Sequence, residues 1–313
     1  MSDEANHAFD FSNFLSAKAS WPTPAVLETY PCRDGSHLGC RHYAATSETE
    51  SETQLAPGES HILIVHGSSS DSRYLACLAM QLADSGYHVH TPDLRGHGPV
   101  PARRGDIDHA LQLEEDLEDL IKSLALPSSA SIYLAGHSAG GGLTLRSSVA
   151  ILERHPTANQ LAGVILLAPY LHHMATNNRR ESTWASPKIA RMLLCSLLDK
   201  LNIHRLDNLV VLKFNIPEQY RDSNTTAAYS WRMMTGLNPK DYQRDLKILF
   251  EHDIPLLALI GEHDEAFIAE RLGDCLSPHH HSAQIEILSD IDHLGIATAH
   301  ITGTHICNWL AER

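Results

Sequence analysis

The sequence is poor in the features that mark nucleic-acid-binding and membrane-spanning proteins. Basic residues are outnumbered, with 24 Lys and Arg against 38 Asp and Glu, and the formal net charge is −14. Nucleic-acid binding relies on Lys and Arg to neutralise phosphates, so the composition argues against a DNA or RNA partner. No apolar run approaches the roughly 20 residues that cross a bilayer, so we expect no transmembrane segment.

Signals for export and for cysteine chemistry are also lacking. The first residues, Met-Ser-Asp-Glu-Ala-Asn-His, are acidic and polar, whereas a signal peptide needs a basic stretch followed by an apolar one. The six cysteines are scattered and include no Cys-x-x-Cys pair. Such a pattern is typical of reduced thiols, so we expect a cytoplasmic protein without a cysteine zinc site. The oligomeric state stays unknown at this point.

What the sequence does contain is a regular alternation of short apolar runs and amphipathic stretches. Such alternation is typical of a parallel sheet covered by helices on both faces. It predicts an α/β fold with a doubly wound, mostly parallel sheet. The expected strands cover residues 62–65, 87–91, 131–135, 164–167, 255–260 and 284–288.

The alternation also suggests how the chain is divided. Residues 1–24 lack periodicity and are expected to form an N-terminal arm, and residues 25–170 and 251–313 to form the core. Between 171 and 250 the rhythm breaks into Leu-, Met- and Trp-bearing helical stretches, which predict an inserted, mainly helical cap. Two strand-like runs flank Asp34-Gly35, a pair that suits a tight hairpin, so antiparallel edge strands are expected there.

The strongest chemical signal is the motif Gly136-His137-Ser138-Ala139-Gly140. It follows an apolar strand and precedes a helix, the context that a G-x-S-x-G nucleophile turn requires. A serine on such a sharp turn has a strained backbone, and crowding across the turn calls for glycine at Gly136 and Gly140. The alternative interpretation, a chance Gly-Ser-Gly loop, would rarely fall between a strand and a helix.

Two backbone N–H groups are candidates for an oxyanion hole. The Ala139 N–H lies at the start of the predicted helix, where free N–H groups and the helix dipole favour negative charge. The Ser68 N–H follows the strand at 62–65, where this type of fold provides its second donor. His66, two residues earlier, is expected to be a hydrogen-bonded structural residue and not the catalytic base.

Three motifs together carry a family resemblance: His66-Gly67, the run from Asp93 to Gly98 (Asp-Leu-Arg-Gly-His-Gly), and the serine motif at 136–140. From about Ala25 onward the chain resembles the monoacylglycerol lipase and lysophospholipase-like branch of the α/β-hydrolases, to which serine aminopeptidases are also similar. In that family a serine usually follows the Asp-x-Arg-Gly-His-Gly loop, where this chain has Pro99. The resemblance implies a Ser-His-Asp catalytic triad.

The chain order nucleophile, acid, histidine directs attention to the last two strands. After the strand at 255–260 comes Gly261-Glu262-His263-Asp264, which is similar to the family's Gly-x-x-Asp acid turn, so Asp264 is predicted to be the acid. After the strand at 284–288 comes His293, the predicted general base. Glu262 and Asp253 are weaker alternatives for the acid, because surface solvation is the commoner role of such carboxylates.

Neither a metal nor an organic cofactor is expected. Among 22 histidines, the run His279-His280-His281 is interpreted as a solvated loop, and no spacing matches a zinc signature. The expected substrate is a small-molecule carboxylic ester, which Ser138 attacks to form an acyl-enzyme. The resemblance implies that its acyl group is apolar. Apolar cap residues such as Phe214 and Met233 could line an acyl pocket or pack the cap. A peptidase or amidase and a non-catalytic binding protein remain alternatives.

Overall fold

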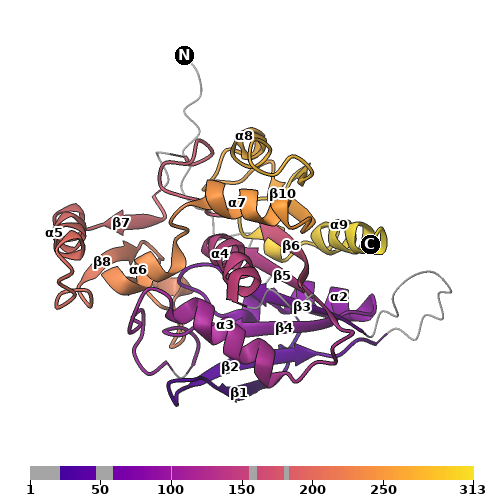
Figure 1. Ribbon diagram of the computed structural model, residues 1–313, viewed down its shortest axis with the longest axis horizontal. Helices are drawn as coiled ribbons and strands as arrows, with labels where there is room; N and C mark the ends of the chain where they lie inside the picture. The colour runs from indigo at the N-terminus through magenta and orange to yellow at the C-terminus, as the bar shows by residue number, and fades with distance from the viewer. Residues whose placement is uncertain (1–21, 47–58, 100, 155–160, 180–182) are drawn as a thin grey trace.

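A computed structural model describes residues 22–46, 59–99, 101–154, 161–179 and 183–313. Its main sheet has eight strands in the order β1-β2-β4-β3-β5-β6-β10-β11 (Figure 1). The neighbouring pairs from β4 to β11 are parallel, whereas β1, β2 and β4 pair antiparallel. The predicted α/β fold with a mostly parallel sheet is confirmed, and the predicted arm at residues 1–24 lies outside the described residues except for its last three.

The two antiparallel edge strands are β1 (Leu27–Pro31) and β2 (His37–Tyr43). Their register pairs Pro31 with His37, so a short turn around Asp34-Gly35 joins them. Gly35 has φ +81°, a left-handed conformation that glycine adopts without steric cost. The hairpin expected from Asp34-Gly35 is therefore confirmed.

The parallel strands are the apolar runs of the sequence, because both faces of such a sheet are covered. Every residue of β3 and of β10 is buried. The strands are β3 (Ser60–Val65), β4 (His88–Asp93), β5 (Ser131–His137), β6 (Leu161–Leu167), β10 (Leu256–Gly261) and β11 (Gln284–Leu288). Their carboxyl ends meet at one edge, where the loops that carry the candidate site residues begin.

Two groups of helices cover the sheet. In the view of Figure 1, α3, α4 and α7 lie in front of the strands, with α4 between the other two. The second group consists of α2 and α9, which contact each other. The bounds are α2 (Ala76–Asp84), α3 (Gln112–Ser123), α4 (Ala139–Arg154), α7 (Tyr242–Glu251), α8 (Leu272–Leu276) and α9 (His300–Ala311). The helix that starts at the serine motif, α4, is the central element of the front layer.

The segment expected to be a cap contains strands that the sequence did not predict. It includes α5 (Ile189–Lys200) and α6 (Trp231–Leu237). Beside them in Figure 1 lie β7 (Ala185–Pro187) and β8 (Val210–Phe214), which form a three-stranded antiparallel sheet with β9 (Ala228–Ser230). These strands are only three to five residues long, too short for an alternating pattern to distinguish them from loops.

Arg146 of α4 joins the helix of the serine motif to the end of α6. Its guanidinium donates to the carbonyl oxygens of Thr235, Gly236 and Asn238 at 2.9–3.1 Å and forms an ion pair with Glu114 of α3. A cation at this end of a helix satisfies carbonyl groups that have no partner within the helix. The buried Arg146 side chain therefore fixes α6 against the core.

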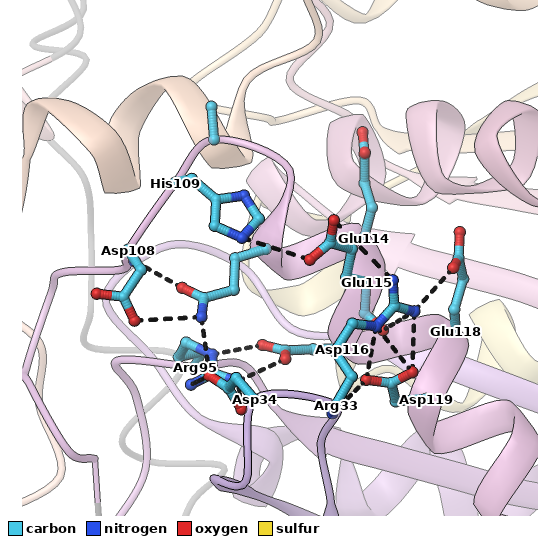
Figure 2. A network of polar contacts seen from close by, with 12 residues as sticks. Arg33, Asp34, Arg95, Asp108, His109, Glu114, Glu115, Asp116, Glu118 and Asp119 are labelled. Atoms are coloured by element: carbon cyan, nitrogen blue, oxygen red, sulfur yellow. Dashed lines mark hydrogen bonds and ion pairs between the residues drawn. The ribbon is translucent and has the colours of Figure 1, made fainter. Parts of the chain in front are cut away.

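Helix α3 carries a second set of ion pairs, which holds the loop after β4 in place (Figure 2). Arg95, in the Asp-Leu-Arg-Gly-His-Gly loop, pairs with Asp116 at 2.6 Å and with Asp34 at 3.0 Å. Arg33 pairs with Asp119 and with Glu118, whose side chain is only 4% exposed. Because buried carboxylates need such partners, the loop, the hairpin turn and α3 form one connected unit.

Candidate active site

Ser138 lies on the sharp turn between β5 and α4. It has φ +54°, in the left-handed region that a non-glycine residue adopts only under local strain. A Cβ atom at Gly136 would lie 2.3 Å from the Gly140 carbonyl oxygen, and one at Gly140 would lie 2.4 Å from the His66 carbonyl oxygen. Both flanking positions therefore require glycine, and the serine side chain remains partly exposed.

The structure brings Ser138, His293 and Asp264 into one hydrogen-bonded row. The Ser138 Oγ lies 3.0 Å from His293 Nε2, and His293 Nδ1 lies 2.7 Å from Asp264 Oδ2. His293 is 3% exposed and Asp264 is 1% exposed. Three turns, after β5, β10 and β11, supply the three side chains, so residues up to 155 positions apart in the sequence meet at one edge of the sheet.

Backbone groups fix the orientation of the Asp264 carboxylate. Its Oδ1 accepts hydrogen bonds from the N–H groups of Ala266 at 2.8 Å and Phe267 at 2.7 Å, which leaves Oδ2 for His293. The two carboxylates weighed as alternatives, Glu262 and Asp253, are both exposed. Asp264 is the one that contacts the histidine.

The electrostatic surroundings of His293 favour its protonated form. Burial alone would lower its pKa, but the charge and hydrogen bond of Asp264, together with the charges of Glu265 and Asp292, raise the pKa above its ordinary value. Glu265 also accepts the His293 backbone N–H at 2.9 Å. The site can therefore stabilise an imidazolium next to the serine.

His137, the variable residue of the serine motif, contacts the backbone of His293. Its Nε2–H donates to the His293 carbonyl oxygen at 2.9 Å, and its Nδ1 accepts from the Tyr74 hydroxyl at 2.8 Å. The Tyr74 hydroxyl in turn accepts the Gly67 N–H at 2.7 Å. Burial holds the pKa of His137 well below its usual range, so this neutral ring is a structural link. No motif in the sequence identifies Tyr74 as part of this link.

The two candidate oxyanion donors belong to residues next to the serine turn: Ala139 follows Ser138, and Ser68 follows Gly67, where an added Cβ would lie 3.3 Å from Ser138 Cβ. No hydrogen-bond partner for the backbone N–H of Ser68 or of Ala139 occurs within the described part of the chain. The neighbouring N–H groups of that loop are already used, since Gly67 donates to Tyr74 and Ser69 donates to the Tyr229 hydroxyl at 2.8 Å. The backbone N–H groups of Ser68 and Ala139 can therefore donate hydrogen bonds to a ligand.

Residues of the segment 171–250 hold the loop that contains Ser68. The Ser69 carbonyl accepts the Thr226 N–H at 3.0 Å, and the Ser69 hydroxyl donates to the Thr226 carbonyl at 2.8 Å. The Tyr229 hydroxyl accepts from Ser69 N–H and donates to His97 Nε2 at 2.7 Å. Sequence reasoning missed Thr226 and Tyr229, because they are about 157–160 positions from Ser69.

His66 occupies the structural role expected for it. Its Nδ1–H donates to the Gly67 carbonyl at 2.8 Å and its Nε2 accepts the Leu94 N–H at 3.0 Å. The ring is fully buried, and burial lowers its pKa. It joins the serine-side loop to the start of the Asp-Leu-Arg-Gly-His-Gly loop, without contacting the Ser138 hydroxyl in any hydrogen bond described for these residues.

Other histidines and apolar residues singled out in the sequence lie outside the row of Ser138, His293 and Asp264. The run His279-His280-His281 is not uniformly solvated: His280 is 1% exposed and its Nε2 contacts the Ile254 carbonyl at 3.0 Å, so that interpretation was wrong for the middle residue. Phe214 and Met233 are buried in the hydrophobic core and pack the cap-side elements, whereas Leu193 and Leu197 of α5 are exposed.

Potential metal ligands gather away from this row of side chains. Within the described ranges, the one group of three that could hold an ion is Asp199, His204 and Asp207, at and after the end of α5.

In the same ranges, every helix is too short or too polar to pass through a lipid bilayer.

Comparisons with known proteins identify the family to which this chain is similar. A family described as serine aminopeptidase, S33, matches residues 56–272. An uncharacterized abhydrolase domain-containing protein of Dictyostelium discoideum is 30% identical over 112 residues, which are 35% of this chain. Those residues are 11% of that relative, so the chain spans about a tenth of its length.

Solved structures of esterases and lipases have the same fold. A soluble variant of monoglyceride lipase from Saccharomyces cerevisiae, in complex with a substrate analogue, has a TM-score of 0.60 at 17% identity, covering 93% of this chain and 95% of that one. Monoacylglycerol lipase from Paleococcus ferrophilus has a TM-score of 0.58 at 18% identity, covering 88% and 98%. A thermophilic esterase from Thermogutta terrifontis has a TM-score of 0.58 at 18% identity, covering 92% and 99%.

At these identities the solved structures establish the fold, and the family match covers more than half of the chain. The resemblance recognised in the motifs is thereby confirmed. The chain belongs to the family described as serine aminopeptidase, S33, and it has the α/β fold of the similar esterase and lipase structures.

Proposed function

We propose that the protein is a serine hydrolase that cleaves carboxylic esters, with Ser138 as nucleophile, His293 as general base and Asp264 as the orienting acid. The observation that carries the proposal is the row of two hydrogen bonds, 3.0 Å from Ser138 Oγ to His293 Nε2 and 2.7 Å from His293 Nδ1 to Asp264 Oδ2. A nucleophile within reach of a base that a third group orients is the arrangement used for acyl transfer.

The reaction starts when His293 Nε2 takes the proton of the Ser138 hydroxyl as Oγ attacks the ester carbonyl carbon. The carbonyl π electrons move to the oxygen and form a tetrahedral oxyanion. When this intermediate collapses, the ester C–O bond breaks and the leaving alcohol takes the proton from His293. Water then repeats the sequence on the acyl-enzyme, which releases the acid and restores Ser138.

The charges around His293 suit the proton transfers. The pKa of His293 is raised because Asp264, Glu265 and Asp292 offset the effect of its burial, so the imidazolium formed during attack is stabilised. The 2.7 Å contact with Asp264 also fixes the tautomer that leaves Nε2 free to accept the serine proton. These residues provide the acid-base chemistry.

The N–H groups of Ser68 and Ala139 are assigned to the oxyanion. A single preorganised donor of this kind is worth about 3 kcal/mol in comparable sites. Ser69 holds the first donor in position, because Tyr229 and Thr226 bind its N–H, carbonyl and hydroxyl groups. Tyr229 is therefore a positioning residue, which acts through Ser69 and does not touch the substrate.

The assigned substrate is a small-molecule ester with an apolar acyl group. Support comes from the names of the three similar solved structures described above, which are two lipases and an esterase. The family description also names an aminopeptidase, and the same side chains can cleave amides, so aminoacyl amides are the second substrate class to test.

The test compares hydrolysis of p-nitrophenyl esters of increasing acyl length by the native protein and by Ser138→Ala. We expect turnover in the native protein and a loss of at least about 10⁴-fold in the variant. Ser289→Ala, which changes an exposed serine, is the matched control and should keep full activity. Turnover of aminoacyl amides alone would favour the peptidase, and equal ester turnover in native protein and Ser138→Ala would overturn the proposal.

The division into parts belongs to the same proposal. We assign residues 25–170 and 251–313 to the catalytic core and 171–250 to the cap, although α7 at the end of that segment packs against α4 of the core. The N-terminal arm, residues 1–24, is a prediction that rests on the sequence alone. A cytoplasmic location likewise rests on the cysteine pattern of the sequence.

A further inference from the structure

A compact group of oxygen and nitrogen ligands lies where α5 ends. Asp199 is in the last turn of α5, and His204 and Asp207 follow in the loop that leads to β8. The His204 Nδ1 atom lies 3.2 Å from Asp199 Oδ1 and 3.0 Å from Asp207 Oδ2. One ligand atom from each of the three residues falls within 4.8 Å of the others.

Asp207 distinguishes this group from an ordinary surface ion pair. Its side chain is 10% exposed, and its Oδ1 atom is buried with no hydrogen-bond partner among the described residues. Removing a carboxylate oxygen from water without a partner is costly. The Oδ1 and Oδ2 atoms share the charge of one carboxylate, so a cation bound at Oδ2 would offset the cost of burying that charge.

The other two ligands are held by residues outside the group. The second oxygen of Asp199, Oδ2, accepts a hydrogen bond from the Trp231 Nε1–H at 3.1 Å, which leaves Oδ1 for a ligand. The Nε2–H of His204 donates to Asn202 Oδ1 at 3.1 Å. A histidine that binds a metal nearly always donates its other N–H to an oxygen in this way, because that bond fixes the tautomer.

We propose that Asp199, His204 and Asp207 bind a divalent transition-metal ion, with Zn²⁺ as the cation of best fit. Zinc accepts imidazole nitrogen and carboxylate oxygen at about 2.0–2.2 Å in a tetrahedral arrangement, so neighbouring ligand atoms are about 3.3 Å apart. The two distances from His204 Nδ1, 3.0 and 3.2 Å, are close to that spacing. A water molecule completes the fourth position, and the ion takes the place of the Nδ1 proton.

The site would join the end of α5 to the start of α6. Besides the contact from Trp231 Nε1 to Asp199, the Arg232 N–H donates to the Asp207 carbonyl at 3.0 Å. A cation between Asp199 and Asp207 therefore joins the end of α5 to the loop before β8, and both of these residues are hydrogen-bonded to the start of α6. This role is structural, and it does not depend on the proposed ester hydrolysis.

The experiment titrates Zn²⁺ into the full-length, chelator-treated protein without a purification tag, followed by isothermal calorimetry and thermal unfolding. We expect one tight equivalent and a Tm rise of about 5 °C at 100-fold excess over Kd. His204→Ala should lose that equivalent and the Tm rise. Asn202→Gly, which keeps the left-handed backbone at φ +56° but removes the side-chain acceptor, should weaken binding by about 10- to 100-fold.

His37→Ala serves as the matched control, because it removes an exposed histidine far along the chain and should retain the tight equivalent. His204 is 56% exposed, so its replacement should leave the Tm of the metal-free protein unchanged. Asp207→Asn is a second variant that keeps the side-chain shape and should also lose the equivalent. Binding of the same stoichiometry and affinity in native protein and His204→Ala, or no tight equivalent in the native protein, would overturn the proposal.

Discussion

The two sides of the candidate active site are built in different ways. On the core side, three turns after β5, β10 and β11 carry the proposed reacting groups. Local backbone features fix two of these residues: Ser138 has a φ of +54°, and neighbouring N–H groups hold the Asp264 carboxylate. On the cap side, Tyr229 and Thr226 contact no reacting group but bind Ser69, next to the candidate oxyanion donor. In the proposed mechanism the core thus supplies the reacting groups, and the proposed cap positions an oxyanion donor.

Substitutions on the two sides of the site should affect the proposed reaction in different ways. A change on the core side removes a group from the reaction itself, so its effect is large and leaves the rest of the site in place. A change on the cap side moves a loop by a small distance, and a misplacement of a fraction of an ångström weakens an oxyanion contact without removing it. Substitutions on the two sides should therefore differ in size and in which kinetic constant they alter.

The largest effect is expected from Asp264→Asn on the core side. The amide keeps the shape of the carboxylate, but it can present N–H to His293 and so favours the tautomer with Nε2 protonated, which cannot accept the serine proton. We expect kcat to fall by about 10⁴-fold with little change in KM. Steady-state kinetics with a p-nitrophenyl ester measure this.

Glu262→Gln is the matched control for that variant, because Glu262 lies in the same turn but is exposed. It should retain native kcat. A small loss in Asp264→Asn, equal to that in Glu262→Gln, would mean that Asp264 has no role in orienting His293.

Tyr229→Phe tests the cap side and should have an intermediate effect. The variant keeps the ring between Phe214 and His97 but removes the hydroxyl that binds Ser69 N–H at 2.8 Å and His97 Nε2 at 2.7 Å. Direct loss of an oxyanion donor costs about 10²- to 10³-fold in kcat. Because Tyr229 acts through Ser69, we expect a fall of about 10- to 100-fold in kcat and a KM within about twofold of native.

Tyr242→Phe, on α7, removes a hydroxyl whose described hydrogen bond is to Gln243 and is the matched control. It should not change kcat. If Tyr229→Phe raised KM and left kcat unchanged, Tyr229 would contribute to substrate binding and not to the oxyanion site, and the contrast between the two sides would fail.

The core side of the candidate site could be predicted from the sequence, whereas the cap side could not. Gly136-His137-Ser138-Ala139-Gly140 predicts its own geometry, because both glycines are required by contacts within about five residues or with the adjacent strand end. Asp264 and His293 could be found because chain order and strand ends place them. All three depend on local backbone and on a sheet whose order the apolar runs imply.

The cap-side residues could not be found in the same manner. Tyr229 reaches Ser69 across 160 positions, through strands of three to five residues that have no detectable period. The acidic run of α3 likewise does not reveal its partners. Glu114, Asp116 and Glu118 are buried, and each forms an ion pair with an arginine from another segment. Charge partners depend on tertiary structure, which composition alone does not specify.

The smallest expected effect comes from Glu265→Gln, on the core side but one step removed from the reaction. His293 acts as a base only when neutral, and its pKa is raised, so kcat/KM should increase with pH through an inflection above the ordinary histidine value of about 6.5. Glu265 is one of the charges that raise this pKa. The glutamine retains an oxygen that can accept the His293 N–H but removes the charge.

We therefore expect the inflection in the Glu265→Gln profile to move to lower pH, while kcat on the high-pH plateau stays near the native value. The measurement is kcat/KM between pH 5 and 9, with Glu262→Gln as the control for loss of an exposed carboxylate in the same turn. The sign follows from the charge: a carboxylate next to an imidazolium favours the protonated ring, and its removal favours the neutral base. An unchanged inflection would show that Asp264 and Asp292 determine the His293 pKa without Glu265, whereas a fall in the plateau would mean that Glu265 positions the His293 backbone through its 2.9 Å contact.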